Sequence, residues 1–149
     1  MPITIFSLKK DGEKYISKNF QVKEFRSKCG SDEVQVDVDL VINFLQVIRD
    51  FYNVAVFVVS GCRSVRHNTA VKGAANSRHL GTYNIFKDTV AIDFTVQGKS
   101  PREVSQKALD LRCPCVIRYA DFTHIDGRTD ANHYATNINS KITKVTKFA

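Results

Sequence analysis

Seven polar residues fall inside apolar runs or at their ends, and their side chains are of the types that perform hydrolytic and metal chemistry. They are Arg63, Ser77, His79, Asp93, Asp121, His124 and Asp126. The clearest case is Asp93, which lies between Ile92 and Phe94 in the run TVAIDFTV. A buried carboxylate without a partner costs several kcal/mol. The pattern therefore predicts a positively charged partner for Asp93.

Two histidines and one carboxylate from separate segments form a three-ligand set that suits zinc. His79 precedes the apolar run that holds Asp93, and His124 lies in FTHIDGR. Strand alternation there places Phe122, His124 and Asp126 on one face. Catalytic zinc sites use three protein ligands and keep a fourth position open. Taken singly, each residue has a simpler interpretation: a loop histidine, a turn-capping acid and a core histidine.

The elements that must position these residues are predicted from apolar periodicity. Apolar residues recur at steps of three and four between 37 and 52 and predict a helix, with Asp37 or Asp39 as its N-cap. Ser100, Pro101 and Glu103 form the start signal of a second helix. The segment 61–82 is rich in Gly and Asn and predicts a loop, with room for one helical turn. Runs rich in β-branched residues predict strands at 54–60, 89–96, 115–120 and 122–128, and a short strand at 3–6.

This order of elements predicts one α+β domain over residues 1–149, with a small antiparallel sheet covered by helices on one face. The polar, basic segment 129–149 is predicted to be a loosely packed tail. Cys113 and Cys115 stand too close together for a zinc knuckle, and they are expected to be small buried hydrophobic residues, as is Cys62. His67 and His133 are expected at the solvated surface.

The net charge and the distribution of basic residues indicate which kinds of molecule the protein could bind. The net charge is +7 and the pI about 9.3, which favours polyanions such as an anionic cell envelope. Basic residues are scattered with no run of five, so no nucleic-acid partner is expected. No apolar stretch is long enough for a membrane span. The N-terminus lacks a secretory signal, so we expect synthesis in the cytoplasm without a signal peptide, and a monomer.

Several separated motifs resemble the M15 zinc peptidases, the group of D-Ala-D-Ala carboxypeptidases and L-alanyl-D-glutamate endopeptidases. The motifs are SKNFQVKEFRSKCG, SGCRS, GAANSRHLGT followed by AIDF, and FTHIDGR, in this order over roughly residues 15–128. The resemblance implies a Hedgehog and D-Ala-D-Ala-peptidase type of fold. It implies a hydrolase of peptidoglycan stem peptides, an endolysin-like enzyme of cell wall degradation that a bacteriophage could encode.

The same resemblance implies roles for the polar residues. His79, Asp93 and His124 become the ligands of Zn²⁺. Arg63 holds a substrate carboxylate or polarises the scissile carbonyl, and Ser77 supports the site. The alternative function is a catalytically inactive zinc-binding or structural module of the same fold, for example in a phage tail.

The general base is the least determined role. The family carries an acid just before the last histidine, which makes Asp121 the first choice and Asp126 the alternative. Regular alternation places Asp121 on the face opposite His124, so its choice requires a bulge or turn at YADF. Asp126 shares the face of His124 but stands two residues further along the strand.

One departure from the family pattern affects the metal set. Thirteen residues separate His79 from Asp93, because TYNIFKDT widens a spacing that is usually shorter. The insertion admits Asp88 as a substitute ligand, although Asp93 keeps the family's A-x-D context. The insertion also bears on the substrate groove, and the sequence leaves open whether the enzyme is a carboxypeptidase or an endopeptidase.

Overall fold

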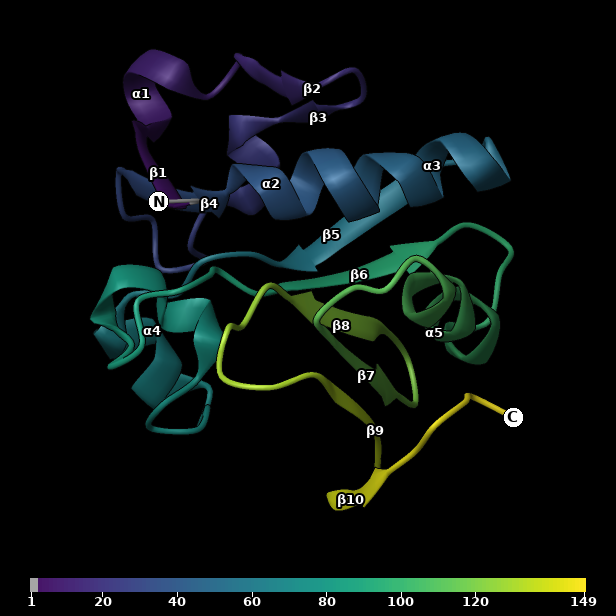
Figure 1. Cartoon of the computed structure of the whole chain (residues 1–149). Helices are drawn as coiled ribbons and strands as arrows, with labels where there is room; N and C mark the ends of the chain where they lie inside the picture. The colour runs from purple at the N-terminus through teal and green to yellow at the C-terminus, as the bar shows by residue number, and fades with distance from the viewer. Residues whose placement is uncertain (1–2) are drawn as a thin grey trace.

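A six-stranded sheet forms the centre of the computed structural model, which describes residues 3–149 (Figure 1). The strand order is β10-β9-β7-β8-β6-β5. Neighbouring strands are antiparallel except β7 and β9, which are parallel. The strands are β5 (Val56–Ser60), β6 (Ile92–Val96), β7 (Cys115–Tyr119), β8 (Thr123–Asp126), β9 (His133–Ile138) and β10 (Lys141–Lys144).

The N-terminal segment forms two small ladders beside this sheet. Strand β1 (Ile3–Ser7) pairs with β4 (Glu33–Asp37), and β2 (Tyr15–Ser17) pairs with β3 (Phe20–Gln21), both antiparallel. Between them lie α1 (Leu8–Asp11) and the short 3₁₀ helix η1 (Val22–Phe25). In Figure 1 the β2–β3 ladder lies across the long helix from the main sheet, and the β1–β4 ladder lies beside the start of that helix.

The long helix predicted over 37–52 is confirmed as a continuous run of α2 (Val38–Leu40), the π-helical η2 (Val41–Leu45) and α3 (Gln46–Tyr52). Asp37 caps it by accepting a hydrogen bond from the Leu40 amide at 3.1 Å. Asn53 ends it in the left-handed conformation, with φ of 53°.

The second predicted helix is also confirmed, as α5 (Pro101–Asp110), with the Ser100 hydroxyl accepting from the Glu103 amide at 3.1 Å. Where the sequence predicts a loop, the structure has α4 (Val65–Ala70) and the 3₁₀ helix η3 (Arg78–Tyr83). Both are short and polar, so their apolar periodicity is too weak to show. Figure 1 places α4 at the end of the sheet opposite α5. No helix within residues 3–149 combines the length and apolar character of a membrane span.

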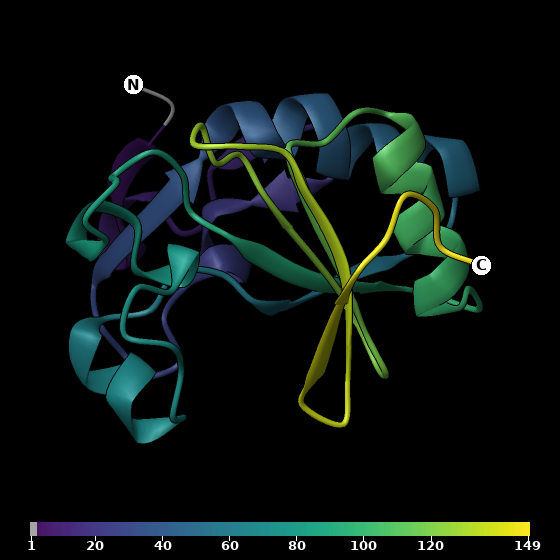
Figure 2. The same ribbon diagram turned by 60° about the horizontal axis from the view of Figure 1, so that its bottom comes forward.

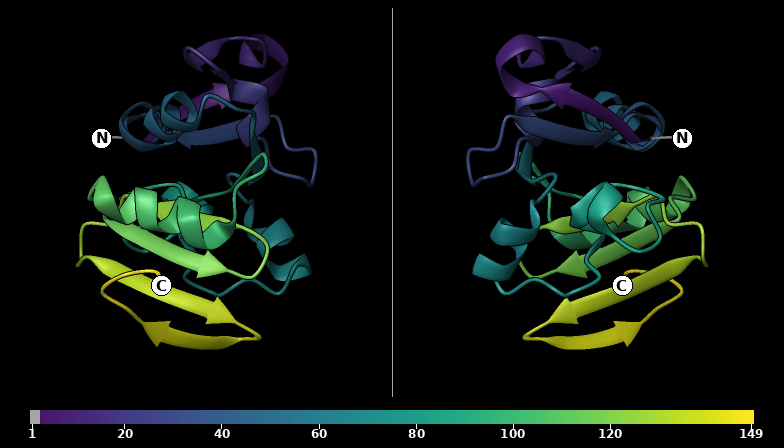
Figure 3. Two further views of the ribbon diagram at one scale, coloured as in Figure 1. Left: turned by 90° about the vertical axis from the view of Figure 1, so that its right-hand side faces the viewer. Right: turned by 90° about the vertical axis from the view of Figure 1, so that its left-hand side faces the viewer.

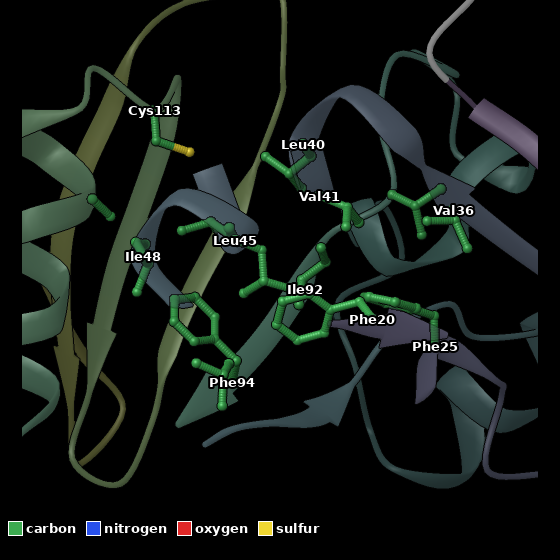
Figure 4. Close-up of a cluster of buried hydrophobic side chains, with 14 of the residues drawn as sticks. Phe20, Phe25, Val36, Leu40, Val41, Leu45, Ile48, Ile92, Phe94 and Cys113 are labelled. Carbon is green, nitrogen blue, oxygen red and sulfur yellow. The ribbon is translucent and has the colours of Figure 1, made fainter. Parts of the chain in front are cut away.

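The hydrophobic core lies between the long helix and the sheet (Figure 4). Leu45 and Ile48 of the helix are fully buried. On β6, Phe94 is fully buried and Ile92 is 2% exposed. Burial of each such side chain stabilises the fold by about 1.5–3 kcal/mol. The core therefore fixes β6, whose alternate residue Asp93 points to the other face of the sheet.

The α+β class is confirmed, but two details of the prediction are wrong. The sheet is larger than expected and mixed, since β9 runs parallel to β7. The segment predicted to be a loose tail supplies β9 and β10 (Figures 2 and 3), buries Ala135 completely and places Phe148 in the core. Edge strand β10 is exposed along its whole length, which explains its polar composition.

Candidate metal site and its cleft

The structure brings the three predicted ligands together on the sheet face away from the long helix. Asp93 of β6 and His124 of β8 are direct partners across the ladder, and His79 comes from η3. The ligand atoms of all three lie within 4.8 Å of one another. Asp93 Oδ1 is 2.8 Å from His124 Nδ1, and Asp93 Oδ2 is 3.2 Å from His79 Nε2. All three residues are buried.

Short backbone contacts hold His79 in place. Ser77 caps η3, and its hydroxyl accepts from the His79 amide at 3.2 Å. The Arg63 amide donates to the His79 carbonyl at 2.8 Å. His79 Nδ1 is 2.7 Å from the Gly61 carbonyl, which can only accept, so Nδ1 carries the proton. The remaining nitrogen, Nε2, is then free to bind a metal.

His124 is held in the same way by a carboxylate. Its Nε2 is 2.8 Å from Asp126 Oδ2, so Nε2 donates and Nδ1 faces Asp93. Asp126 is completely buried and accepts two bonds from the Arg128 guanidinium, at 2.8 and 2.7 Å, and one from the Arg128 amide at 3.1 Å. A histidine that donates one ring N–H to a carboxylate and offers the other nitrogen to a metal is common in metal sites.

The pKa shifts of the buried acids and of His124 are those expected of a site that can hold a cation. Burial by itself raises the pKa of Asp93, but His79 and His124 outweigh it and hold that pKa below its usual range. Asp126 is likewise buried, and Arg128 and His124 lower its pKa. Burial lowers the pKa of His124, yet Asp126 and Asp93 raise it well above its ordinary value. In the metal-free protein a proton on His124 therefore balances the carboxylates.

The donor set fits zinc. Two imidazole nitrogens and a carboxylate oxygen converge, and the second nitrogen of each ring already has an acceptor. A second group, Cys115 with His124 and Asp126, also lies within ligand range. Asp126 is committed to Arg128 there, and burial raises the pKa of the Cys115 thiol, which stays protonated and is a poor ligand.

The three ligands lie in the wall of a cleft of about 540 Å³. Its charged side chains are mostly cationic, and Asp93 is the one carboxylate in the wall that the described residues form. Arg63 Nη2 lies 3.9 Å from Asp93 Oδ2, and Arg63 Nη1 contacts Asn68 Oδ1 at 3.3 Å. The cationic residues of the wall are Arg63, Lys72, Arg78 and Arg128.

The other predicted acids do not reach the cleft. Asp121 is exposed and lines a separate small cavity with Lys99 and Pro101, beside α5. The turn expected at YADF is present between β7 and β8, but it does not bring Asp121 to the metal group. The first residue of β8, Thr123, bonds to Ser105 of α5 at 3.0 Å. Asp126 lies behind His124 rather than in the cleft wall.

The inserted segment is ordered by a buried ion pair that the sequence did not indicate. Asp88 pairs with Arg78 at 3.4 Å and accepts from the Thr129 amide at 3.0 Å, so it is not part of the metal group. Arg78 also bonds to Asp130 at 3.0 Å and stacks on Phe86 at 4.1 Å. Among the residues missed, only Arg128 had a sequence signal, its position two residues after Asp126.

The remaining histidines and cysteines are separate from the site. His67 of α4 is half-buried, and His133 is half-buried in β9 rather than in a solvated tail. Cys62, Cys113 and Cys115 are buried, as predicted, and all four cysteines are free. Cys29 is the exposed one.

Comparison with known proteins gives one match. A family model described as Peptidase M15 matches residues 18–126. The matched range contains Arg63 and the whole metal group. Neither the curated proteins nor the solved structures contain a significant match.

Proposed function

Because the chain belongs to the peptidase M15 family, we propose that it is a zinc-dependent peptidase that hydrolyses peptidoglycan stem peptides. One observation carries the proposal: two histidines and an aspartate converge in the wall of a basic cleft. We propose further that it is a monomeric, phage-encoded lytic enzyme that acts at the bacterial cell wall.

His79 Nε2, His124 Nδ1 and a carboxylate oxygen of Asp93 would hold the metal. When bound, zinc polarises the scissile carbonyl and lowers the pKa of the attacking water to about 7. Ser77 and the Gly61 carbonyl orient His79, while Asp126 orients His124. These contacts support a site that is ordered before the metal arrives.

Arg63 is the substrate-facing group of the proposed site. Its side chain is 17% exposed, and Asn68 and Asp93 hold the guanidinium at the cleft wall. A guanidinium fork binds a carboxylate in two-point fashion or donates to a carbonyl oxygen that gains charge. The basic cleft suits stem peptides, which carry several carboxylates.

We propose Asp126 as a positioning residue of His124 and not as the base, since it is bonded to His124 and Arg128 and has no face in the cleft. We do not propose Asp121 as the base, because it lines another cavity. The cleft wall then offers no second carboxylate among the described residues. This observation favours the alternative, a zinc-binding module without activity.

A turbidity assay separates the two functions. Zinc-loaded protein is added to a suspension of purified peptidoglycan, with Asp93→Ala as the matched metal-site control. The peptidase proposal expects clearing by the wild type and none by the variant. A wild type that binds zinc and leaves the suspension turbid would support the inactive module instead.

A further inference from the structure

A second pocket of about 330 Å³ adjoins the metal-site cleft, and the two share Arg63 in their walls. Its lining includes Glu33, Gln35 and Tyr83, together with the hydroxyl-bearing Ser27, Ser31 and Ser64. We call it the Glu33 pocket. A ligand that reaches from one side of Arg63 to the other would occupy both spaces.

The Glu33 pocket is built by β4 and the start of the insertion. Glu33 and Gln35 lie two residues apart and share a face of β4. Gln35 Nε2 donates to Thr82 Oγ1 and to Glu33 Oε1, both at 2.9 Å, and its Oε1 accepts from the Thr82 amide at 2.8 Å. The Tyr83 hydroxyl donates to Glu33 Oε1 at 3.0 Å. The insertion therefore docks on β4 and closes one side of the pocket.

Gly81 permits this close approach. Its φ of +57° lies in the left-handed region, and a Cβ there would stand 2.2 Å from Gln35 Oε1. A side chain at this position would displace the Gln35 amide from its bonds to Thr82. The left-handed conformation of Gly81 thus lets η3 pack against β4 at the wall of the Glu33 pocket.

The charge of the Glu33 pocket differs from that of the basic cleft, because the charged side chains among the described residues that line it are Glu33 and the shared Arg63. Glu33 is the one carboxylate among the described residues that line it, with both bonds from Gln35 and Tyr83 made to Oε1. Within residues 3–149 no hydrogen bond is made to Glu33 Oε2, and the residue is half-buried. The guanidinium nitrogens of Arg63 contact Asn68 and Asp93, so the positive charge faces the cleft. The pocket therefore presents a carboxylate oxygen and several hydroxyl oxygens.

We propose that the Glu33 pocket binds the ammonium group of a diamino acid side chain in the substrate. The ammonium has three donors and no acceptor, which matches Glu33 Oε2 and the serine hydroxyls. A substrate would then be held by a carboxylate on one side of Arg63 and by an amine on the other. This inference rests on the proposed peptidase function, because it assigns a second subsite to the same cleft.

The test compares two stem tetrapeptides that differ only in the side-chain amine of a lysine at the third position, free in one and acetylated in the other. Their dissociation constants are measured by calorimetry on metal-free protein, where no hydrolysis occurs. The free amine should bind about three- to tenfold more tightly. Glu33→Gln should abolish that difference, and Glu13→Gln, which changes an exposed glutamate that contacts Lys23, should keep it.

Equal affinity of the wild type for the two peptides, or no binding of either, would overturn the inference without need of any variant. An unchanged preference in Glu33→Gln would also overturn it. The peptidase proposal fails separately: zinc-loaded wild type that prefers the free amine but cleaves neither peptide would leave the Glu33 pocket in place. Cleavage of both peptides at equal kcat/KM, with equal affinities, would refute the Glu33 pocket alone.

Discussion

Asp126→Asn tests the assignment of Asp126 as the residue that orients His124. The substitution keeps the shape of the side chain and removes its charge. In the wild type this carboxylate accepts from His124 Nε2 at 2.8 Å and from two guanidinium nitrogens and the amide of Arg128. An asparagine offers one acceptor oxygen and an NH₂ group, so it cannot serve both partners.

The size of the effect follows from these contacts. Loss of a carboxylate that supports a metal-binding histidine lowers metal affinity by about 10–100-fold. The variant also leaves Arg128 without its partner, and breaking a buried pair costs about 3–5 kcal/mol. The Arg128 side chain is 17% exposed, so we expect the low end, about 3 kcal/mol of unfolding free energy.

The assay is a zinc competition titration against a chelating dye, paired with chemical denaturation of the metal-free protein. Asp121→Asn is the matched control, since Asp121 is exposed and does not line the cleft; the unfolding free energy of this variant should change by less than about 0.5 kcal/mol. Zinc affinity of Asp126→Asn within twofold of the wild type would refute the reasoning. A large loss of activity in Asp121→Asn with zinc retained would restore Asp121 as the base.

Three further predictions concern the metal and the substrate. His124→Ala should abolish stoichiometric zinc binding in elemental analysis, and a zinc content equal to that of the wild type would reject His124 as a ligand. Arg63→Ala should keep zinc and the thermal unfolding midpoint while lowering kcat/KM by about 10²-fold or more; full activity would show that Arg63 does not touch substrate. The raised pKa of His124 means that its proton stabilises the metal-free fold fully below about pH 6.5, and that contribution is lost as pH rises through the folded-state pKa. Zinc displaces this proton, so the gain in unfolding midpoint on adding zinc should grow from about pH 6 to pH 8, and a gain that shrinks over this range would contradict the ligand assignment.

Two members of the metal group, Asp93 and His124, could be predicted because each stands in a strand pattern that sets the direction of its side chain. His79 lies in η3, where the sequence predicted a loop, so its place followed from the motif alone. Asp93 alternates with buried Ile92 and Phe94, so the core side of β6 fixes the carboxylate on the other face. His124 obeys the same alternation in β8. Asp121 lies in the turn between β7 and β8, where neither alternation nor the family pattern sets its direction, and it lines another cavity.

The parts that could not be predicted depend on contacts between distant segments. Strand β9 pairs in parallel with β7, and no local signal in a polar segment reveals such a partner. Glu33 lies in β4, which is not among the predicted strands, and it nears Arg63 because β4 docks against the insertion. The pair Arg78–Asp88 likewise forms only once the insertion folds back.

Mass spectrometry of muropeptides after digestion of purified peptidoglycan tests the central claim most directly. The account predicts stem-peptide fragments, formed by the addition of one water across a peptide bond, with zinc-loaded wild type and not with Asp93→Ala. The position of that bond would also identify a carboxypeptidase or an endopeptidase. Unchanged muropeptides after incubation with protein that holds one zinc per chain would contradict the account.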